Sequence, residues 1–337
     1  MLLESLKHGE TPEALQDLSM ILRQIRVKGE DPVIPIDESI RLAKKAITMN
    51  MNDHKSWYVL GNAHYMRFFA ASQDVGDLKK ALVAYTRSEA LGGDCNPDLF
   101  FNRGNVFRYL QDYSAAQLSY GRAIDIDPSF TDSQEAAESV TAFVNRANEM
   151  VNKRGWFQKK RLDKIIQQLS VSRHIQGCTG LRTLQVGANV GVTLAVCVLM
   201  PATTGNIPPE CFLCVDADGI CAIVSIYNIG HDAPPPSPNI VMTIRDPVVS
   251  DTSLDMTDIH STTASSNSPT GPTGESASLK DVEADDSSPP LASVGDEVRP
   301  RVLLVQAFSL DNVKVDGRAL NRGAVAPPQL VVNISDS

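Results

Sequence analysis

One stretch of the chain, DLFFNRGNVFRYLQDYSAAQLSYGRAIDIDP at Asp98–Pro128, constrains the fold more than any other. Gly104 and Ala116 are small, so two successive helices could approach closely at these positions, and Tyr120 is spaced to fill the wedge between them. Pro128 ends the second helix because a proline cannot continue the ladder of backbone hydrogen bonds. The stretch therefore predicts two antiparallel helices packed as a hairpin.

Together with Phe107 and Ala123, these residues have the spacing of a 34-residue tetratricopeptide (TPR) repeat. Trp57 and Gly61 open a preceding repeat, whose second helix carries Tyr85. Further runs with a helical period lie at Gln16–Val27, Asp37–Met49, Glu135–Val151 and Lys159–Leu169. An insertion that interrupts the preceding repeat is expected at Phe68–Asp77. Because each repeat buries its apolar face only against its neighbours, we expect a helical solenoid of about two and a half repeats closed by capping helices.

The pattern changes near Leu181 to short β-branched or apolar runs separated by Gly, Pro and Asp. The sequence Asp216-Ala217-Asp218-Gly219 is a hairpin signal. The expected strands are Leu181–Gly187, Gly191–Leu199, Cys211–Val215, Ile220–Tyr227, Ile240–Ile244 and Val302–Phe308. Short strands at this density predict a small barrel or sandwich. Ser250–Gly295 is rich in Ser, Thr, Pro and acidic residues, which predicts a disordered insertion between two late strands.

Several classes of function are disfavoured by composition. A net charge of −9 argues against binding of nucleic acid over the whole surface. The most apolar stretch, Val186–Met200, is short for a membrane span, and the N-terminus has no apolar run of signal-peptide length. We therefore expect no membrane contact, no secretion and reduced cysteines.

Neither a metal site nor a catalytic site is expected. Cys211, Cys214 and Cys221 invite a zinc interpretation, but no second CxxC or paired His follows at ligand spacing, and alternation within strands explains them better. The sequence has no Ser-His-Asp or Cys-His arrangement and no glycine-rich phosphate loop. These observations predict a protein that is not an enzyme and holds no cofactor.

A candidate binding face lies on the first helix of the complete repeat. Asp98, Phe101, Asn105 and Arg108 follow i, i+3, i+7, i+10 spacing and share a side distinct from the packing side. Tyr58, Asn62 and Tyr65 take the equivalent places one repeat earlier. Amides can hold a peptide backbone, aromatic rings offer apolar area, and the Asp and Arg supply charge, so we expect a peptide-binding concave surface. The alternative is an ordinary solvated inner face.

A basic segment follows the long helix. Lys159, Lys160 and Arg161 are the centre of a cluster of Lys and Arg in an otherwise acidic chain, with Trp156 and Phe157 beside them. A local positive patch with aromatic residues can contact RNA phosphates despite a negative net charge. A solvated linker between domains is the alternative.

Four segments carry a family resemblance. SMILRQIR (Ser19–Arg26), SWYVLGNAHY (Ser56–Tyr65), NPDLFFNR (Asn96–Arg103) and CVDADGICAIVSIYNI (Cys214–Ile229) resemble the family of tetratricopeptide repeat protein 5. The resemblance implies an α+β multidomain fold, in which an α-helical TPR solenoid is followed by a small all-β OB-fold barrel. It implies a non-enzymatic adaptor of cytoplasm and nucleus that recognises the nascent tubulin N-terminus at the ribosome and recruits an mRNA-decay adaptor. A nuclear scaffold in the stress response, linking transcription factors to co-activators, is the alternative that the family also implies.

The resemblance also points to individual residues. By position, Arg23, Asp98 and Asp132 match family residues that contact the nascent peptide, and lysines of the basic segment match contacts to ribosomal RNA. An ordinary surface charge is the alternative for Arg23. For Asp132 the alternative is an N-cap or first-turn carboxylate favoured by the helix dipole.

The expected organisation follows from these assignments. Residues 1–130 form a partial TPR array with its complete repeat at 97–130, and residues 131–173 form the capping helices and basic linker. Residues 174–249 and 296–337 form the OB-fold, interrupted by the disordered insertion at 250–295. Family members have further repeats before the point where this chain begins, so Met1–Ala14 resembles a truncated start.

Overall fold

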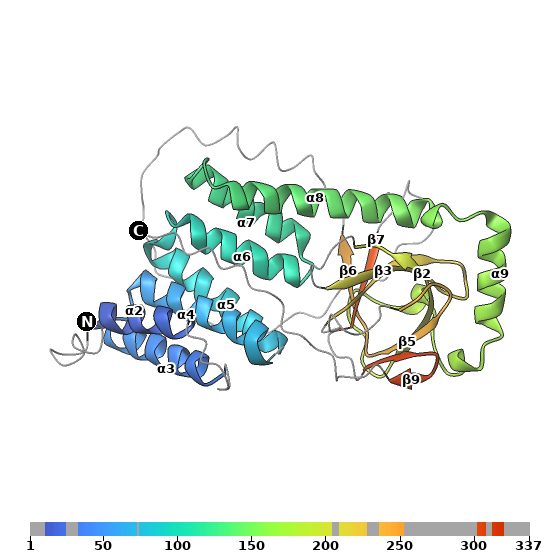
Figure 1. The fold of residues 1–337 in the computed structure, drawn as a ribbon, viewed down its shortest axis with the longest axis horizontal. Helices are drawn as coiled ribbons and strands as arrows, with labels where there is room; N and C mark the ends of the chain where they lie inside the picture. Colours follow the sequence, from blue (N-terminus) through green and yellow to red (C-terminus); the bar gives the residue numbers. More distant parts are fainter. Residues whose placement is uncertain are drawn as a thin grey trace, which may run out of the picture.

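A stack of antiparallel helices is followed along the chain by a twisted sheet (Figure 1). The computed structural model describes residues 11–24, 33–72, 74–203, 209–227, 236–252, 302–307 and 312–319. The helices are α2 (Pro12–Leu22), α3 (Val33–Met49), α4 (His54–Arg67), α5 (Val75–Ser88), α6 (Pro97–Tyr109), α7 (Tyr113–Ile126), α8 (Thr131–Asn152) and α9 (Lys159–Ser170). Shorter turns are η2 (Phe68–Ser72), η3 (Glu89–Gly93), η4 (Arg154–Trp156), η5 (Arg173–Ile175) and η6 (Leu181–Thr183).

The same glycine–tyrosine contact packs two successive helix pairs. A Cβ on Gly104 of α6 would lie 2.6 Å from the Tyr120 ring of α7, and one on Gly61 of α4 would lie 2.5 Å from the Tyr85 ring of α5. Both tyrosines are fully buried. The prediction that small residues admit a wedge-filling tyrosine is confirmed, and these helices form a TPR-like solenoid.

The segment expected to be an insertion lengthens one hairpin. After α4 the chain continues through η2, which buries Phe68 and Phe69. Their rings meet Tyr109 of α6 edge to face, with centroids 4.9 and 5.3 Å apart. The extra residues therefore add apolar contact area to the neighbouring repeat.

Within its described residues the sheet region holds nine strands in the order β1-β6-β7-β4-β3-β2-β5-β8-β9. Among the strand pairs of the described residues, β4 and β7 are parallel and the other pairs are antiparallel. The strands are β1 (Gly187–Ala188), β2 (Thr193–Pro201), β3 (Glu210–Val215), β4 (Cys221–Ile226), β5 (Val241–Arg245), β6 (Val248–Thr252), β7 (Val302–Ala307), β8 (Val313–Val315) and β9 (Arg318–Ala319). The edge strands β1 and β9 do not pair with each other, so within the described residues the sheet is not closed into a barrel.

Two strand predictions need correction. Leu181–Gly187 is not a strand, because Leu181 begins the turn η6 and its backbone N–H donates to a carboxylate oxygen of Asp216 at 2.8 Å. Strand β6 was not expected, and its residues 250–252 fall within the segment assigned to the insertion. The rest of that segment, 253–295, lies outside the described residues.

The predicted hairpin turn at Asp216–Gly219 is confirmed. It joins β3 to β4, with the Asp216 N–H donating to the Ile220 carbonyl at 3.0 Å. Gly219 has a φ of 79°, a conformation that glycine adopts at little cost.

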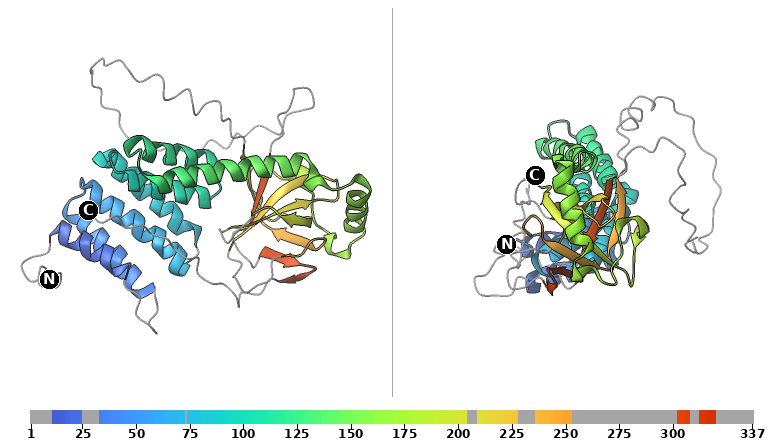
Figure 2. Two further views of the ribbon diagram at one scale, coloured as in Figure 1. Left: turned by 45° about the horizontal axis from the view of Figure 1, so that its top comes forward. Right: turned by 90° about the vertical axis from the view of Figure 1, so that its right-hand side faces the viewer.

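The helical and sheet parts share one core. Apolar residues of α7, α8 and α9 pack against one face of β2, β3 and β4, and α8 passes from the last helix pair of the array to the sheet (Figures 1 and 2). The turn after α6 is held by the sheet, since the Tyr227 hydroxyl donates to the Tyr109 carbonyl at 2.8 Å and Gln306 Nε2 donates to the Leu110 carbonyl at 2.9 Å. None of the described helices has both the length and the apolar composition needed to cross a membrane.

Candidate functional site

Two predicted site residues that are far apart in sequence, Arg23 and Asp98, act electrostatically on the same tyrosine. Arg23 caps the end of α2, Tyr58 lies in α4, and Asp98 lies in the first turn of α6. Burial raises the pKa of the Tyr58 hydroxyl, the charge of Asp98 raises it further, and the charge of Arg23 opposes both effects. Both charges therefore lie within electrostatic reach of the same hydroxyl.

The two charges are poorly solvated. Burial lowers the pKa of Arg23 to about 10, which still leaves the guanidinium protonated at neutral pH. Its Nε donates to the Ser19 carbonyl at 3.3 Å, and no acidic group pairs with it among the described residues. Burial, and then the nearby charge of Asp127, raise the pKa of Asp98, whose carboxylate accepts no hydrogen bond in the described part of the chain. An arginine and a carboxylate are therefore both available to a ligand.

Asparagine side chains follow these charges along the concave face. The Tyr85 hydroxyl donates to Asn62 Oδ1 at 2.8 Å, and the Tyr120 hydroxyl donates to Asn105 Oδ1 at 2.8 Å. In each repeat the buried tyrosine thereby fixes the amide of its partner helix. The Asn62 side chain also hydrogen-bonds the Tyr58 hydroxyl, whereas the Nδ2 group of Asn105 has no acceptor among the described residues. Each Nδ2 group carries two hydrogens, so both amides can donate to the carbonyls of an extended peptide.

Asn102 belongs to this face and was not predicted. Its Nδ2 donates to Asn62 Oδ1 at 3.1 Å and to the Tyr58 hydroxyl at 3.4 Å. Its position four residues after Asp98 is a signal that could have been used, because i and i+4 side chains share a face of a helix.

The remaining predicted peptide-binding residues lie beyond the asparagines. Phe101 is half-buried, and its ring centroid lies 6.0 Å from that of Tyr120 and 5.1 Å from that of Phe130. Asp132 is half-buried in the first turn of α8, where Phe130 is the N-cap residue. The N-cap alternative for Asp132 is therefore wrong, whereas its first-turn position agrees with a carboxylate favoured by the helix dipole.

The predicted basic residues form a separate surface on α9. Lys159, Lys160 and Arg161 are exposed in its first turn, at the end of the sheet region distant from the array (Figure 1). The Arg161 guanidinium stacks 4.8 Å from the centroid of the Phe157 ring. Trp156 is 53% exposed, an uncommon exposure for tryptophan. The surface offers cations and an accessible aromatic ring together.

The cysteines of the CxxC sequence point away from each other. Cys211 packs in the core shared with α8, whereas Cys214 packs in the core on the opposite face of the sheet. Burial raises the pKa of the Cys211 thiol to about 12. Among the described residues, no three His, Cys, Asp or Glu side chains come together in a way that could hold a metal ion.

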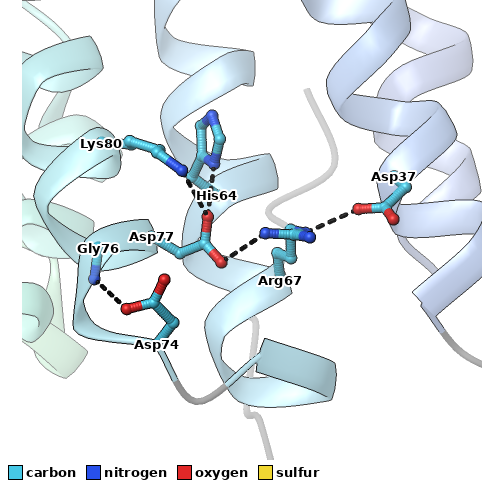
Figure 3. A network of polar contacts seen from close by, with 7 residues as sticks. All are labelled: Asp37, His64, Arg67, Asp74, Gly76, Asp77 and Lys80. Carbon is cyan, nitrogen blue, oxygen red and sulfur yellow. Dashed lines mark hydrogen bonds and ion pairs between the residues drawn. The ribbon is translucent and has the colours of Figure 1, made fainter.

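A second polar cluster holds the first helices of the array together (Figure 3). Asp77 is fully buried at the start of α5, and its two carboxylate oxygens meet His64 Nδ1 at 3.1 Å and Arg67 at 2.9 Å. Arg67 also reaches Asp37 of α3 at 2.7 Å, and Lys80 lies 3.8 Å from Asp77. Because its charges are paired within the protein, this cluster joins three helices and does not present a binding site.

Comparison with known proteins identifies similar sequences. No protein-family model matches the chain. Tetratricopeptide repeat protein 5 of Homo sapiens, of Mus musculus and of Bos taurus is each 30% identical over 263 residues, covering 70% of this chain and 60% of the relative. The chain thus spans about three fifths of the length of these relatives.

Similar solved structures share the helical part. A thermophilic TPR protein of Thermus thermophilus has a TM-score of 0.37 at 17% identity, covering 52% of this chain and 83% of its own. MamA has a TM-score of 0.33 at 21% identity, covering 41% of this chain and 72% of its own. At these scores the likeness carries no argument about function.

TPR hairpins stack into arrays whose extended concave surfaces are used for binding. The chain, with its helical repeats and the sheet that follows them, is thus similar in sequence over 70% of its length to tetratricopeptide repeat protein 5.

Proposed function

We propose that the concave face of α2, α4 and α6 binds a short, charged peptide, and that this peptide is the N-terminus of nascent tubulin as it leaves the ribosome. The observation that carries the proposal is the pair of opposite charges, Arg23 and Asp98, which both act on Tyr58 and form no ion pair among the described residues. The tubulin assignment is supported by the family resemblance. The bound adaptor would then recruit a factor for mRNA decay.

The chemistry of the face suits an extended peptide with both signs of charge. Asp98 would pair with an N-terminal amine or a basic side chain, and Arg23 with an acidic one. The amide Nδ2 groups of Asn62 and Asn105 would donate to backbone carbonyls, and Phe101 would cover an apolar side chain. Short peptides typically bind such a face with a Kd near 1 μM, which is a binding free energy of about −8 kcal/mol.

The exposed basic surface of α9 would contact ribosomal RNA. Lys159, Lys160 and Arg161 can neutralise phosphates, and Trp156 can stack on an unpaired base. This surface lies beyond the sheet from the array, so peptide and RNA could be held simultaneously (Figure 1).

An OB-fold within the sheet region remains part of the proposal. Support comes from the central strand order β7-β4-β3-β2-β5, which contains a meander and one parallel pair. A five-stranded, partly open Greek-key barrel has a comparable arrangement.

The peptide assignment is tested by fluorescence anisotropy with a labelled peptide of the tubulin N-terminus. Arg23→Ala and Asp98→Asn should each weaken binding about tenfold, since each removes one poorly solvated partner of a charge pair. Arg87→Ala is the matched control, because Arg87 is exposed on α5 and makes no ion pair among the described residues. Affinities of both variants equal to that of the wild type would overturn the proposal.

The RNA contact is tested separately by co-sedimentation with ribosomes. Lys159→Glu combined with Lys160→Glu should abolish sedimentation at physiological salt without changing the affinity for the free peptide. Unchanged sedimentation would remove RNA binding from the proposed function and leave peptide binding in place.

A further inference from the structure

A cavity of about 290 Å³ lies where the last helices of the array meet the sheet. Arg108 lines it from α6, Phe143 and Arg146 line it from α8, and Thr203 and Cys211 line it from the sheet region. None of the sequence motifs identified this cavity, because its walls come from segments that are distant in the chain.

The cavity is positively charged without compensation. Two arginines and no Asp or Glu stand among its described lining residues. Neither the Arg108 nor the Arg146 side chain forms a hydrogen bond or ion pair with another described residue, and Arg146 is exposed. The hydroxyls of Ser139 and Thr203 add donors, and Val140 with Phe143 supplies an apolar wall. This combination suits a carboxylate on a short aliphatic stem.

The cavity and the concave face share helix α6. Arg108 lies three residues after Asn105 on this helix, and its charge acts on the hydroxyl of Tyr65 on the concave face and on that of the buried Tyr120. An extended peptide lying along α6 would therefore reach the cavity without leaving the protein surface.

Two parallel helices give this surface a charge gradient. The rings of Phe101 and Phe130 lie 5.1 Å apart near the starts of α6 and α8, and the cavity is lined by the end of α6 and the middle of α8. Carboxylates occupy the first turns, at Asp98 and Asp132, whereas Arg108 lies in the last turn of α6 and Arg146 lies in the second half of α8. On α8, Asp132, Ser139 and Arg146 follow i, i+7, i+14 spacing and so share one face.

We propose that this cavity binds an acidic side chain of the same peptide whose positive charge is held at Asp98. At 1.5 Å per residue, Asp98 and Arg108 are separated by about 15 Å along α6. An extended chain covers about 3.3 Å per residue, so the acidic residue lies about four to five positions from the positive one. The inference rests on the proposed peptide-binding function and specifies which peptides the face selects.

The test uses the full chain and a series of labelled nine-residue peptides. Each peptide has one lysine near its N-terminus and a single glutamate placed two, four, five or seven residues further along, in an otherwise neutral sequence. Affinity should be highest at spacings of four and five. Replacing that glutamate with glutamine should lower the affinity about fivefold, as expected for a partly exposed charge pair.

Two protein variants show where the glutamate is recognised. In Arg146→Gln, and in Arg108→Gln, the glutamate and glutamine peptides should bind alike, whereas Arg87→Gln should keep the fivefold difference. Arg146 is exposed, so its substitution leaves the fold intact, which circular dichroism checks. Inorganic phosphate at millimolar concentration should not compete with the glutamate peptide, because a free anion lacks the contacts of the concave face.

Each contrary result has a separate meaning. If the glutamate and glutamine peptides bind the wild type equally, or if the spacing has no effect, the cavity does not select an acid and the inference fails while peptide binding stands. Displacement of the peptide by phosphate would make the cavity a site for free anions, which also overturns it. If no peptide of either kind binds, the proposed function fails together with the inference.

Discussion

Replacing the buried Asp77 by asparagine should destabilise the helical array substantially. Asp77 is fully buried, and its carboxylate is held between His64, Arg67 and the more distant Lys80 (Figure 3). Asparagine has nearly the same shape, so Asp77→Asn removes the negative charge and leaves the packing in place. The change therefore isolates the contribution of the charge.

The magnitude follows from the contacts with Arg67 and Lys80, because the asparagine side chain still offers His64 a hydrogen-bonding partner. A hydrogen bond to a charged group contributes about 1.5–3 kcal/mol, and this range applies to the 2.9 Å contact with Arg67. Lys80 is 59% exposed and 3.8 Å away, so solvent screening reduces its share to about 0–0.5 kcal/mol. Arg67 keeps Asp37 at 2.7 Å, which limits the penalty for its unpaired charge. We therefore expect a loss of about 2–3 kcal/mol, less than the 3–5 kcal/mol of a fully buried broken pair.

Urea unfolding followed by far-ultraviolet circular dichroism measures this loss. Asp125→Asn is the matched control, because Asp125 is exposed on α7 and its substitution should change stability by less than about 0.5 kcal/mol. Combining Asp77→Asn with Arg67→Gln should give a coupling energy of about 1–2 kcal/mol. If Asp77→Asn unfolds at the same urea concentration as the control, shape and not charge holds these helices, and the reasoning is wrong.

Three further outcomes are expected. Burial lowers the pKa of His64 below its usual 6.5, so as the pH falls the unfolded state binds a proton at His64 before the folded state does. The stability measured by thermal melting should therefore fall as the pH drops below about 6.5, and it should fall less steeply in His64→Gln. Gly104→Ala places a methyl group 2.6 Å from the Tyr120 ring and should cost about 1–3 kcal/mol in urea unfolding, while an equal stability would show that the ring can move aside. Exposed Cys95 should react with a thiol reagent in the native protein. Cys214 is buried, which raises the pKa of its thiol strongly, so it should react only after unfolding. Mass spectrometry of the labelled peptides distinguishes the two cysteines.

The helical array was predictable because its packing rules are local in the sequence. Gly104 and Tyr120 lie in adjacent helices, so their contact follows from one repeat and its spacing. The same holds for the turn at Asp216–Gly219, which is closed by hydrogen bonds between Asp216 and residues at most four positions away. In both cases the residues that determine the local structure belong to the same short sequence motif from which the structure was predicted.

The sheet was less predictable because strand pairing joins distant segments. Leu181–Gly187 has the composition of a strand, but the side chain of Asp216 captures the Leu181 N–H and the chain turns there. Strand β6 has a Ser, Asp and Thr composition typical of linkers, and it forms because β7 pairs with it. Neither outcome could be derived from local propensity.

The candidate site combines both situations. Periodicity placed Asp98, Phe101 and Asn105 on one face of α6, and the structure agrees. The position of Arg23 beside Tyr58 came only from the family resemblance, and Arg146 was missed because α8 carries no repeat pattern that would indicate which of its faces meets the sheet. Site residues that neighbouring helices contribute can be identified only from the three-dimensional arrangement of those helices.

The proposed binding surface therefore includes the sheet region as a structural part. Gln111, in the turn between α6 and α7, has a φ of 61°, which a non-glycine residue adopts at some cost. Its buried Nε2 donates to the Ser225 hydroxyl at 2.5 Å, so the sheet stabilises the turn in that conformation. The same turn sets the end of α6, and with it the position of Arg108. An array cut off after α8 would lose both the sheet wall of the cavity and the bonds that fix this turn, and it would be expected to bind peptides without discriminating the acidic residue.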